Sequence, residues 1–114
     1  MLLFRLFLAA CFLVLVGYTV VTISIDGWNL LPVFFGDIAE MRWPGQFNAD
    51  FFTFLLLSGL WVSWRHGFSA GGLALGLVAV FGGMVFLSVY LIFHSYRCQG
   101  NMAALLLGPQ RVAA

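Results

Sequence analysis

Long stretches without a charged residue constrain the fold of this chain more than any other feature. Residues 6–25, 51–64 and 67–93 contain no Asp, Glu, Lys or Arg, and charged residues make up only 8% of the sequence. A helix rises about 1.5 Å per residue, so roughly 20 apolar residues cross the hydrocarbon core of a bilayer. The sequence therefore predicts an all-α integral membrane protein that forms one domain.

The predicted fold is a small bundle of three transmembrane helices with an interfacial first loop. The helices are expected over about 3–25, 48–64 and 71–96, with an interfacial loop at 26–47 that could contain a short helix lying flat on the membrane, and a short C-terminal tail at 97–114. The uncharged part of the second helix is about three residues shorter than a usual span, so either the helix crosses a thinned region of the membrane or Asp50 is drawn about one turn below the surface.

Tryptophans lie near the expected ends of the helices. An indole ring combines an apolar body with one N–H donor, which suits the boundary between lipid and water. The predicted interfacial anchors are Trp28, Trp43, Trp61 and Trp64.

Glycines recur along one face of the expected third helix. Gly72 and Gly76 are four residues apart, and Gly83 follows seven residues later. Small residues at such spacing let two helices approach closely, and close approach is a main source of packing attraction in lipid. These glycines are predicted to form a helix-packing face.

Charge gives a weak indication of orientation and excludes one class of partner. The chain has five arginines, no lysine and a net charge of +1, so it lacks the basic patch that nucleic-acid binding requires. With three straight spans, Arg5 and Arg65 would share one membrane face with His66, and the other arginines would share the opposite face. We expect a cytoplasmic N-terminus and a C-terminus on the other side.

Several polar residues are expected to meet where the second helix starts and the third helix ends. An acid near lipid is a candidate functional group, so this polar cluster could handle protons or a ligand around Asp50 and His94. Asp50 could instead cap its helix or pair with Arg97. The candidate polar cluster comprises Asp50, Tyr90, His94, Arg97, Asp26 and Arg42.

Sequence motifs give no indication of a catalytic or metal site. The two histidines would lie on opposite membrane faces, so they could not share a metal, and no nucleotide-binding loop or nucleophile elbow occurs. The cofactor therefore stays unknown, although a single residue such as His94 could bind haem iron or chlorophyll-type magnesium.

From Phe47 onward the chain resembles small bacterial three-helix integral membrane proteins of unknown function. The resemblance covers about half of the chain, excludes the long first loop, and implies an architecture and a bacterial inner membrane but no activity. It depends on Phe47, Asp50, Trp61, Arg65, Gly82, Gly83, Tyr90 and Leu91.

These observations favour a small, non-catalytic accessory or structural subunit of a larger membrane complex. Three helices bury little of one another, which leaves apolar surface for the lipid bilayer, for other membrane subunits or for self-association. One alternative is a ligand-handling protein, either a minimal oligomeric transporter or an enzyme with a lipophilic substrate, that uses Asp50 and His94. Another is a pigment- or haem-binding subunit of an energy-converting complex.

Overall fold

The protein is a chain of helices connected by short turns, and no strand occurs among residues 1–112, which are the residues that the computed structural model describes. The elements are α1 (Leu2–Asp26), α2 (Leu30–Glu40), α3 (Trp43–Arg65), α4 (Ala70–Arg97), α5 (Met102–Leu107) and the short 3-10 helix η1 (Pro109–Arg111). The predicted all-α class is confirmed. By length and composition, α1 and α4 could each cross a membrane, with mean hydropathies of 2.5 and 2.4.

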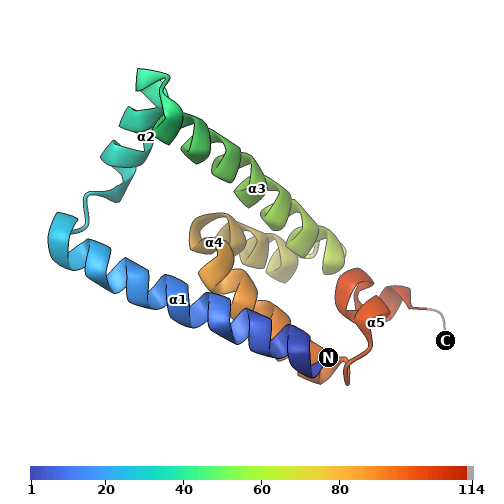
Figure 1. The fold of residues 1–114 in the computed structure, drawn as a ribbon. Helices are drawn as coiled ribbons and strands as arrows, with labels where there is room; N and C mark the ends of the chain where they lie inside the picture. Colours follow the sequence, from blue (N-terminus) through green and yellow to red (C-terminus); the bar gives the residue numbers. More distant parts are fainter. Residues whose placement is uncertain (113–114) are drawn as a thin grey trace.

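A sharp bend divides α4 into two halves, residues 70–82 and 84–97. Gly83 has φ 56° and ψ −143°, a backbone conformation outside the helical region that glycine adopts without a steric penalty. Figure 1 shows the two halves of α4 running from the bend toward the same end of the molecule. The prediction of one continuous helix over 71–96 is therefore wrong at Gly83. This glycine forms the bend and does not extend the predicted packing face along a straight helix.

Contacts with His66 show how completely the chain reverses. A methyl group added to Gly72, in the first half of α4, would lie 2.6 Å from His66 Cβ. Tyr90, in the second half, has its hydroxyl 2.8 Å from His66 Nε2. Residues 72 and 90 would be about 27 Å apart along a straight helix.

The reversal also brings the two ends of the chain together. A methyl group added to Gly100 would lie 3.7 Å from Met1 Cβ. In Figure 1 the N-terminus, the end of α4 and α5 lie at the same end of the molecule. The expectation that the chain ends face opposite directions is therefore wrong for residues up to 112. The last two residues of the predicted tail lie outside the described residues.

Glycines allow α3 and the first half of α4 to pack closely, as the spacing of Gly72 and Gly76 predicts. A methyl group on Gly76 would overlap Ser63 Oγ and would lie 2.8 Å from the Gly59 carbonyl oxygen. Gly72 is similarly close to the Ser63 carbonyl, with its added methyl 3.3 Å away. Van der Waals contact between two backbones requires small residues on both helices.

Helix α1 packs against the second half of α4, and only its first half is covered. Arg5 donates from Nε to Ser95 Oγ at 2.9 Å and from Nη2 to the Ser95 carbonyl at 3.1 Å. Its guanidinium also lies 3.7 Å from the centre of the Tyr96 ring. In Figure 1, α1 and α3 diverge from this end, and α2 joins them at the other.

The connection over 26–47, which was expected to be a loop or a short helix, contains α2 and the first turn of α3. Helix α3 begins at Trp43, five residues earlier than the predicted start at 48, and Pro44 lies in its first turn. Proline is tolerated there because the first N–H groups of a helix have no intrahelical partner. Asn48 Nδ2 donates to the Phe34 carbonyl at 3.2 Å and fixes α2 against α3.

Replacing Gly76 with Ala should destabilise the α3–α4 contact, because the new methyl has no room beside Ser63 and Gly59. The expected loss is about 1–3 kcal/mol, as for other overpacked sites. It can be measured from thermal or denaturant unfolding in detergent.

The matched control is Gly71→Ala. Nothing lies within 4 Å of a methyl group at Gly71. This substitution should be neutral or should stabilise the helix by up to about 1 kcal/mol. Equal stability of the two variants would show that Gly76 does not face α3.

Candidate functional site

The last residue of α3, Arg65, is buried at the point where α3, α4 and α5 meet. Only 1% of its surface is exposed. Its Nε donates to the Leu105 carbonyl at 2.6 Å, and its Nη2 donates to the Ala104 carbonyl at 3.4 Å. These two acceptors belong to the last turn of α5, where carbonyl groups carry partial negative charge; the Ala104 carbonyl also accepts from the Gly108 N–H at 2.9 Å.

No carboxylate is among the hydrogen-bond partners that Arg65 has in residues 1–112. The remaining partners are the Tyr90 hydroxyl, 3.2 Å from Nη1, and Cys98 Sγ, 3.7 Å from Nη2. Burying an arginine costs several kcal/mol unless its donors are satisfied. Here backbone carbonyls and neutral side chains satisfy them, so the charge is stabilised without an ion pair.

Tyr90 connects Arg65 to His66. Because a guanidinium can only donate, the Tyr90 oxygen accepts from Arg65 and can still donate its own proton to His66 Nε2, 2.8 Å away. This arrangement requires a neutral imidazole whose Nε2 is unprotonated. Burial lowers the pKa of His66 below its ordinary value of 6.5, and the neighbouring charge of Arg65 lowers it further, so the neutral form is favoured.

His94 completes the group that we call the Arg65 cluster, which consists of Arg65, His66, Tyr90, His94 and Cys98. The centre of the His94 ring lies 4.4 Å from that of Tyr90 and 5.7 Å from that of His66. Among residues 1–112, no three His, Cys, Asp or Glu side chains are arranged to hold a metal ion. The described contacts engage Nε, Nη1 and Nη2 of the guanidinium, so this cluster is suited to fixing helix ends in place.

The tail adds a second set of contacts to the end of α3. Gln110 Nε2 donates to the Arg65 carbonyl at 2.6 Å, and Arg111 Nη1 donates to the same oxygen at 3.2 Å. Arg65 thus donates to the end of α5 while its own carbonyl accepts from the residues that follow α5. Backbone carbonyls at the ends of α3 and α5 therefore receive hydrogen bonds from side chains of the other segment, as buried backbone groups require.

Two of the four predicted tryptophan anchors contact this tail. The indole N–H of Trp61 donates to the Leu106 carbonyl at 3.0 Å, and the Arg111 guanidinium lies 4.1 Å from the centre of the Trp64 ring. Trp28 and Trp43 are exposed. The first pair therefore has a structural role within the chain, and the interfacial role stays a prediction for the second pair.

The structure divides the predicted polar cluster between two ends of the molecule. Tyr90 and His94 do lie side by side, but the bend at Gly83 places them beside Arg65 and His66. The Arg97 guanidinium lies 5.7 Å from the Phe93 ring. Asp50 lies 15 residues before Arg65 on α3, a rise of about 22 Å.

Asp50 also has neither of the structural roles considered for it. Helix α3 begins at Trp43, so Asp50 lies within the helix and cannot cap its start. Its backbone carbonyl accepts from Thr53 Oγ1 at 2.6 Å, and its side chain is exposed. Pairing with Arg97 is prevented because Arg97 ends the reversed half of α4.

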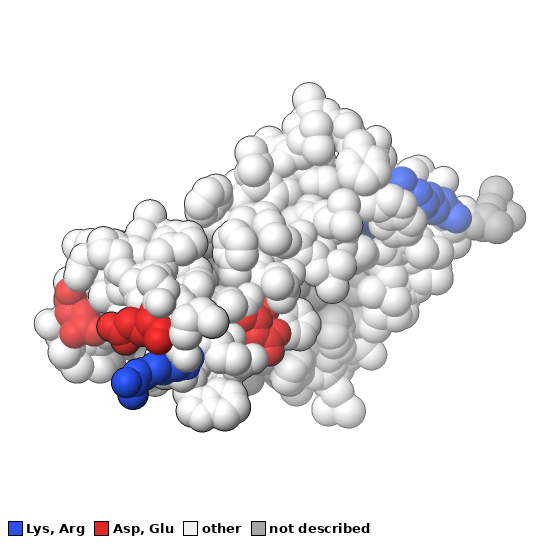
Figure 2. Space-filling model, turned by 90° about the horizontal axis from the view of Figure 1, so that it is seen from above, with Lys and Arg blue, Asp and Glu red and all other residues white. Residues whose placement is uncertain are grey.

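Charges of opposite sign gather at opposite ends of the molecule. Asp26 and Arg42 belong to the end around α2, together with Asp37, Glu40 and Asp50, whereas Arg5, Arg65, Arg97 and Arg111 belong to the end around α5. Figure 2 shows acidic atoms over the part of the surface away from the C-terminus, with basic atoms beside the C-terminus. All four acids and one arginine give the α2 end a formal charge of −3, and four arginines give the other end +4.

Sequence reasoning missed Arg65, His66 and Cys98 as partners of Tyr90. It assigned Arg65 to the membrane surface because a long side chain at a helix end can reach water. The signal that could have identified the cluster is the adjacent pair Gly82 and Gly83 in the middle of a long apolar run, since a glycine pair is a common cause of a sharp kink.

Comparison with protein-family models, with curated proteins and with solved structures gives no match to this chain.

Replacing Arg65 with Met should release α5 from α3. The change leaves the Leu105 carbonyl without its buried donor and removes one of the two donors of the Ala104 carbonyl, at a cost of about 1–3 kcal/mol. Amide hydrogen exchange in residues 102–107 should become at least about fivefold faster.

Arg97→Met is the matched control because it removes the same charge from the same end of the molecule. Arg97 is exposed and contacts only the Phe93 ring among the interactions described. Exchange in α5 should stay unchanged in this variant. If both variants loosened α5 equally, net charge and not the buried hydrogen bonds would explain the effect.

Proposed function

We propose that this chain is an integral membrane protein that acts as a small, non-catalytic accessory or structural subunit. The observation that carries the proposal is the uncovered half of α1. Tyr18 and Ile25 are 74% and 76% exposed, within a helix whose mean hydropathy reaches 2.5. Apolar surface of this kind needs lipid or another protein around it.

The exposed side chains of α1 form a stripe at alternating spacings of four and three residues. The stripe consists of Val14, Tyr18, Val21 and Ile25, all of them exposed. Residues at this spacing share one face of a helix and are the positions that contact a partner in helix–helix packing. We propose that this α1 stripe binds a transmembrane helix of another subunit or of a second copy.

The separation of charge supports a definite orientation for this proposal. Arginine is enriched on the cytoplasmic side of membrane proteins, and four of the five arginines belong to the α5 end. In the proposed arrangement both described ends of the chain face the cytoplasm. Helices α1 and α3 cross the membrane, and α4 enters from the cytoplasmic side and returns to it. A bacterial inner membrane would suit the resemblance noted in the sequence.

The Arg65 cluster favours a structural role over catalysis. Arg65 is buried, its guanidinium nitrogens contact fixed partners of the chain itself, and the Tyr90 hydroxyl is engaged by Arg65 and His66. A catalytic centre needs a group that can approach a substrate. Asp50 and His94 belong to opposite ends of the molecule, so their separation gives no support to the ligand-handling alternative.

The proposal can be tested with a photo-crosslinking amino acid placed at Tyr18 or Ile25 in the native membrane. These positions are seven residues apart on the α1 stripe, so both should give one adduct of the same mass. Phe12 is the control because it lies against the second half of α4. It should give only crosslinks within the chain. Adducts with lipid alone at Tyr18 and Ile25 would contradict a subunit role.

A further inference from the structure

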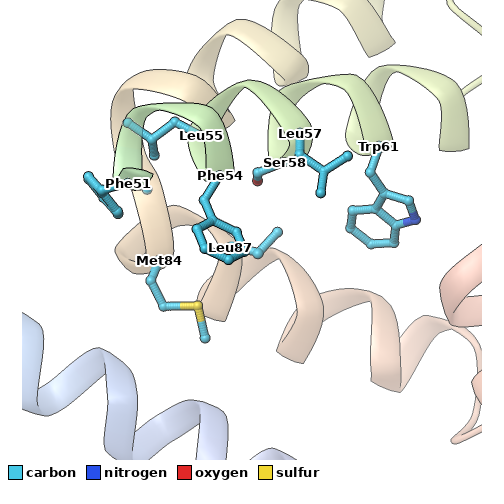
Figure 3. Close-up of a pocket in the computed structure, with 9 residues that line it drawn as sticks. Phe51, Phe54, Leu55, Leu57, Ser58, Trp61, Met84 and Leu87 are labelled. Carbon is cyan, nitrogen blue, oxygen red and sulfur yellow. The ribbon is translucent and has the colours of Figure 1, made fainter. Parts of the chain in front are cut away.

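An elongated apolar cavity lies between α3 and the second half of α4. Its volume is about 380 Å³, and its walls come from Phe51, Phe54, Leu55 and Trp61 of α3 and from Met84 and Leu87 of α4. Figure 3 shows Phe54 and Trp61 of α3 and Leu87 of α4 in the space between the two helices. Along α3 the lining runs from Phe51 to Trp61, a length of about 15 Å.

The bend in α4 produces this cavity. At Gly83 the chain turns away from α3 without a side chain, and an added methyl group would lie 3.3 Å from the Phe51 ring. The space is an open groove and not an enclosed void, because Phe54 and Leu57 in its walls are 65% and 60% exposed. Its volume falls within the range of ligand pockets, and its apolar walls need lipid or protein around them.

The walls determine the chemistry of that occupant. Ser58 is the one lining residue with a side-chain oxygen or hydroxyl, and its Oγ is covered and has no hydrogen-bond partner among the described residues. Trp61 directs its indole N–H to the Leu106 carbonyl and not into the cavity. Because this one hydroxyl is covered, a headgroup, a peptide backbone or a water molecule would reach no side-chain hydrogen-bond partner there, whereas a hydrocarbon chain needs none.

The membrane placement of α4, which rests on the proposed function, identifies a source for such a chain. Each half of α4 is about 20 Å long, so the bend would lie within a hydrocarbon core of about 30 Å. The hairpin would leave roughly 10 Å of that core uncovered on the far side of Gly83. Lipid tails would fill this region and would have direct access to the cavity past Phe51 and Phe54, both of which are exposed.

We infer that the cavity between α3 and the second half of α4 binds one hydrocarbon chain of a membrane lipid. The chain lies along α3 from Phe51 toward Trp61 and completes the packing that the bend leaves open. The Met84 side chain in the cavity wall can adjust to the shape of the bound hydrocarbon chain, since methionine is unbranched and flexible.

Quenching of Trp61 fluorescence tests this inference. The protein retains Trp61 as its only tryptophan, with Phe at positions 28, 43 and 64, and is purified in dodecyl maltoside. Phosphatidylcholine with an acyl chain brominated at its centre is titrated into the micelles. A bound chain should quench Trp61 with a signal that saturates at one lipid per protein.

Two phenylalanine substitutions on α3 separate binding in the cavity from contact with bulk lipid. Leu57 lines the cavity, and its neighbour Leu56 is equally apolar but points to another side of α3. Leu57→Phe should reduce the saturating component at least about tenfold, and Leu56→Phe should leave it unchanged. Quenching that rises in proportion to the lipid fraction, equally in all three proteins, would overturn the inference.

A second reporter distinguishes failure of this inference from failure of the proposed function. Tyr18→Trp, in a chain without the native tryptophans, places the fluorophore at the exposed centre of α1. In bilayers of the same brominated lipid it should be quenched by bulk contact. Quenching at position 18 without saturable quenching of Trp61 would refute the bound lipid chain alone. The absence of quenching at both positions would also refute the proposed placement of the protein in the membrane.

Discussion

The conformation of Gly83 determines which parts of the chain meet. Its left-handed φ of 56° reverses α4 and brings Tyr90, His94 and Cys98 back to the end of α3. There Arg65 is buried without a carboxylate partner and is satisfied by two carbonyls of α5, a tyrosine and a thiol. A straight α4 would leave this guanidinium without Tyr90 and Cys98, so the reversal and the buried arginine depend on each other.

The reversal of α4 underlies both proposals, the role as a membrane subunit and the binding of a lipid chain. It collects four of the five arginines at one end, which is the basis for our proposal that both described ends of the chain face the cytoplasm. It also makes α4 too short to cover α1 and α3 along their full length. The uncovered length of α1 presents the stripe that we propose binds another helix, and the space beside the bend is where we infer a lipid chain binds.

Local patterns in the sequence predicted the helices better than their arrangement. The uncharged run that ends at Ile25 predicted α1, and the spacing of Gly72 and Gly76 predicted a helix-packing face without identifying α3 as its partner, because both patterns depend on neighbouring residues of one helix. The bend at Gly83 was missed because glycine at that position is equally compatible with a packing face. The start of α3 at Trp43 was missed, although Pro44 suits the first turn of a helix. The Arg65 cluster could not be predicted without the bend, since its members are up to 33 residues apart in sequence.

Cysteine accessibility in native membranes tests the central claim most directly. Single cysteines replace Leu3, Trp28 or Met102, all exposed, in a chain carrying Cys11→Ala and Cys98→Ser. A membrane-impermeant maleimide should label Leu3→Cys and Met102→Cys from the same side and Trp28→Cys from the opposite side. Labelling of Met102→Cys together with Trp28→Cys would show that α4 crosses the membrane as a straight helix and would contradict the reversal at Gly83.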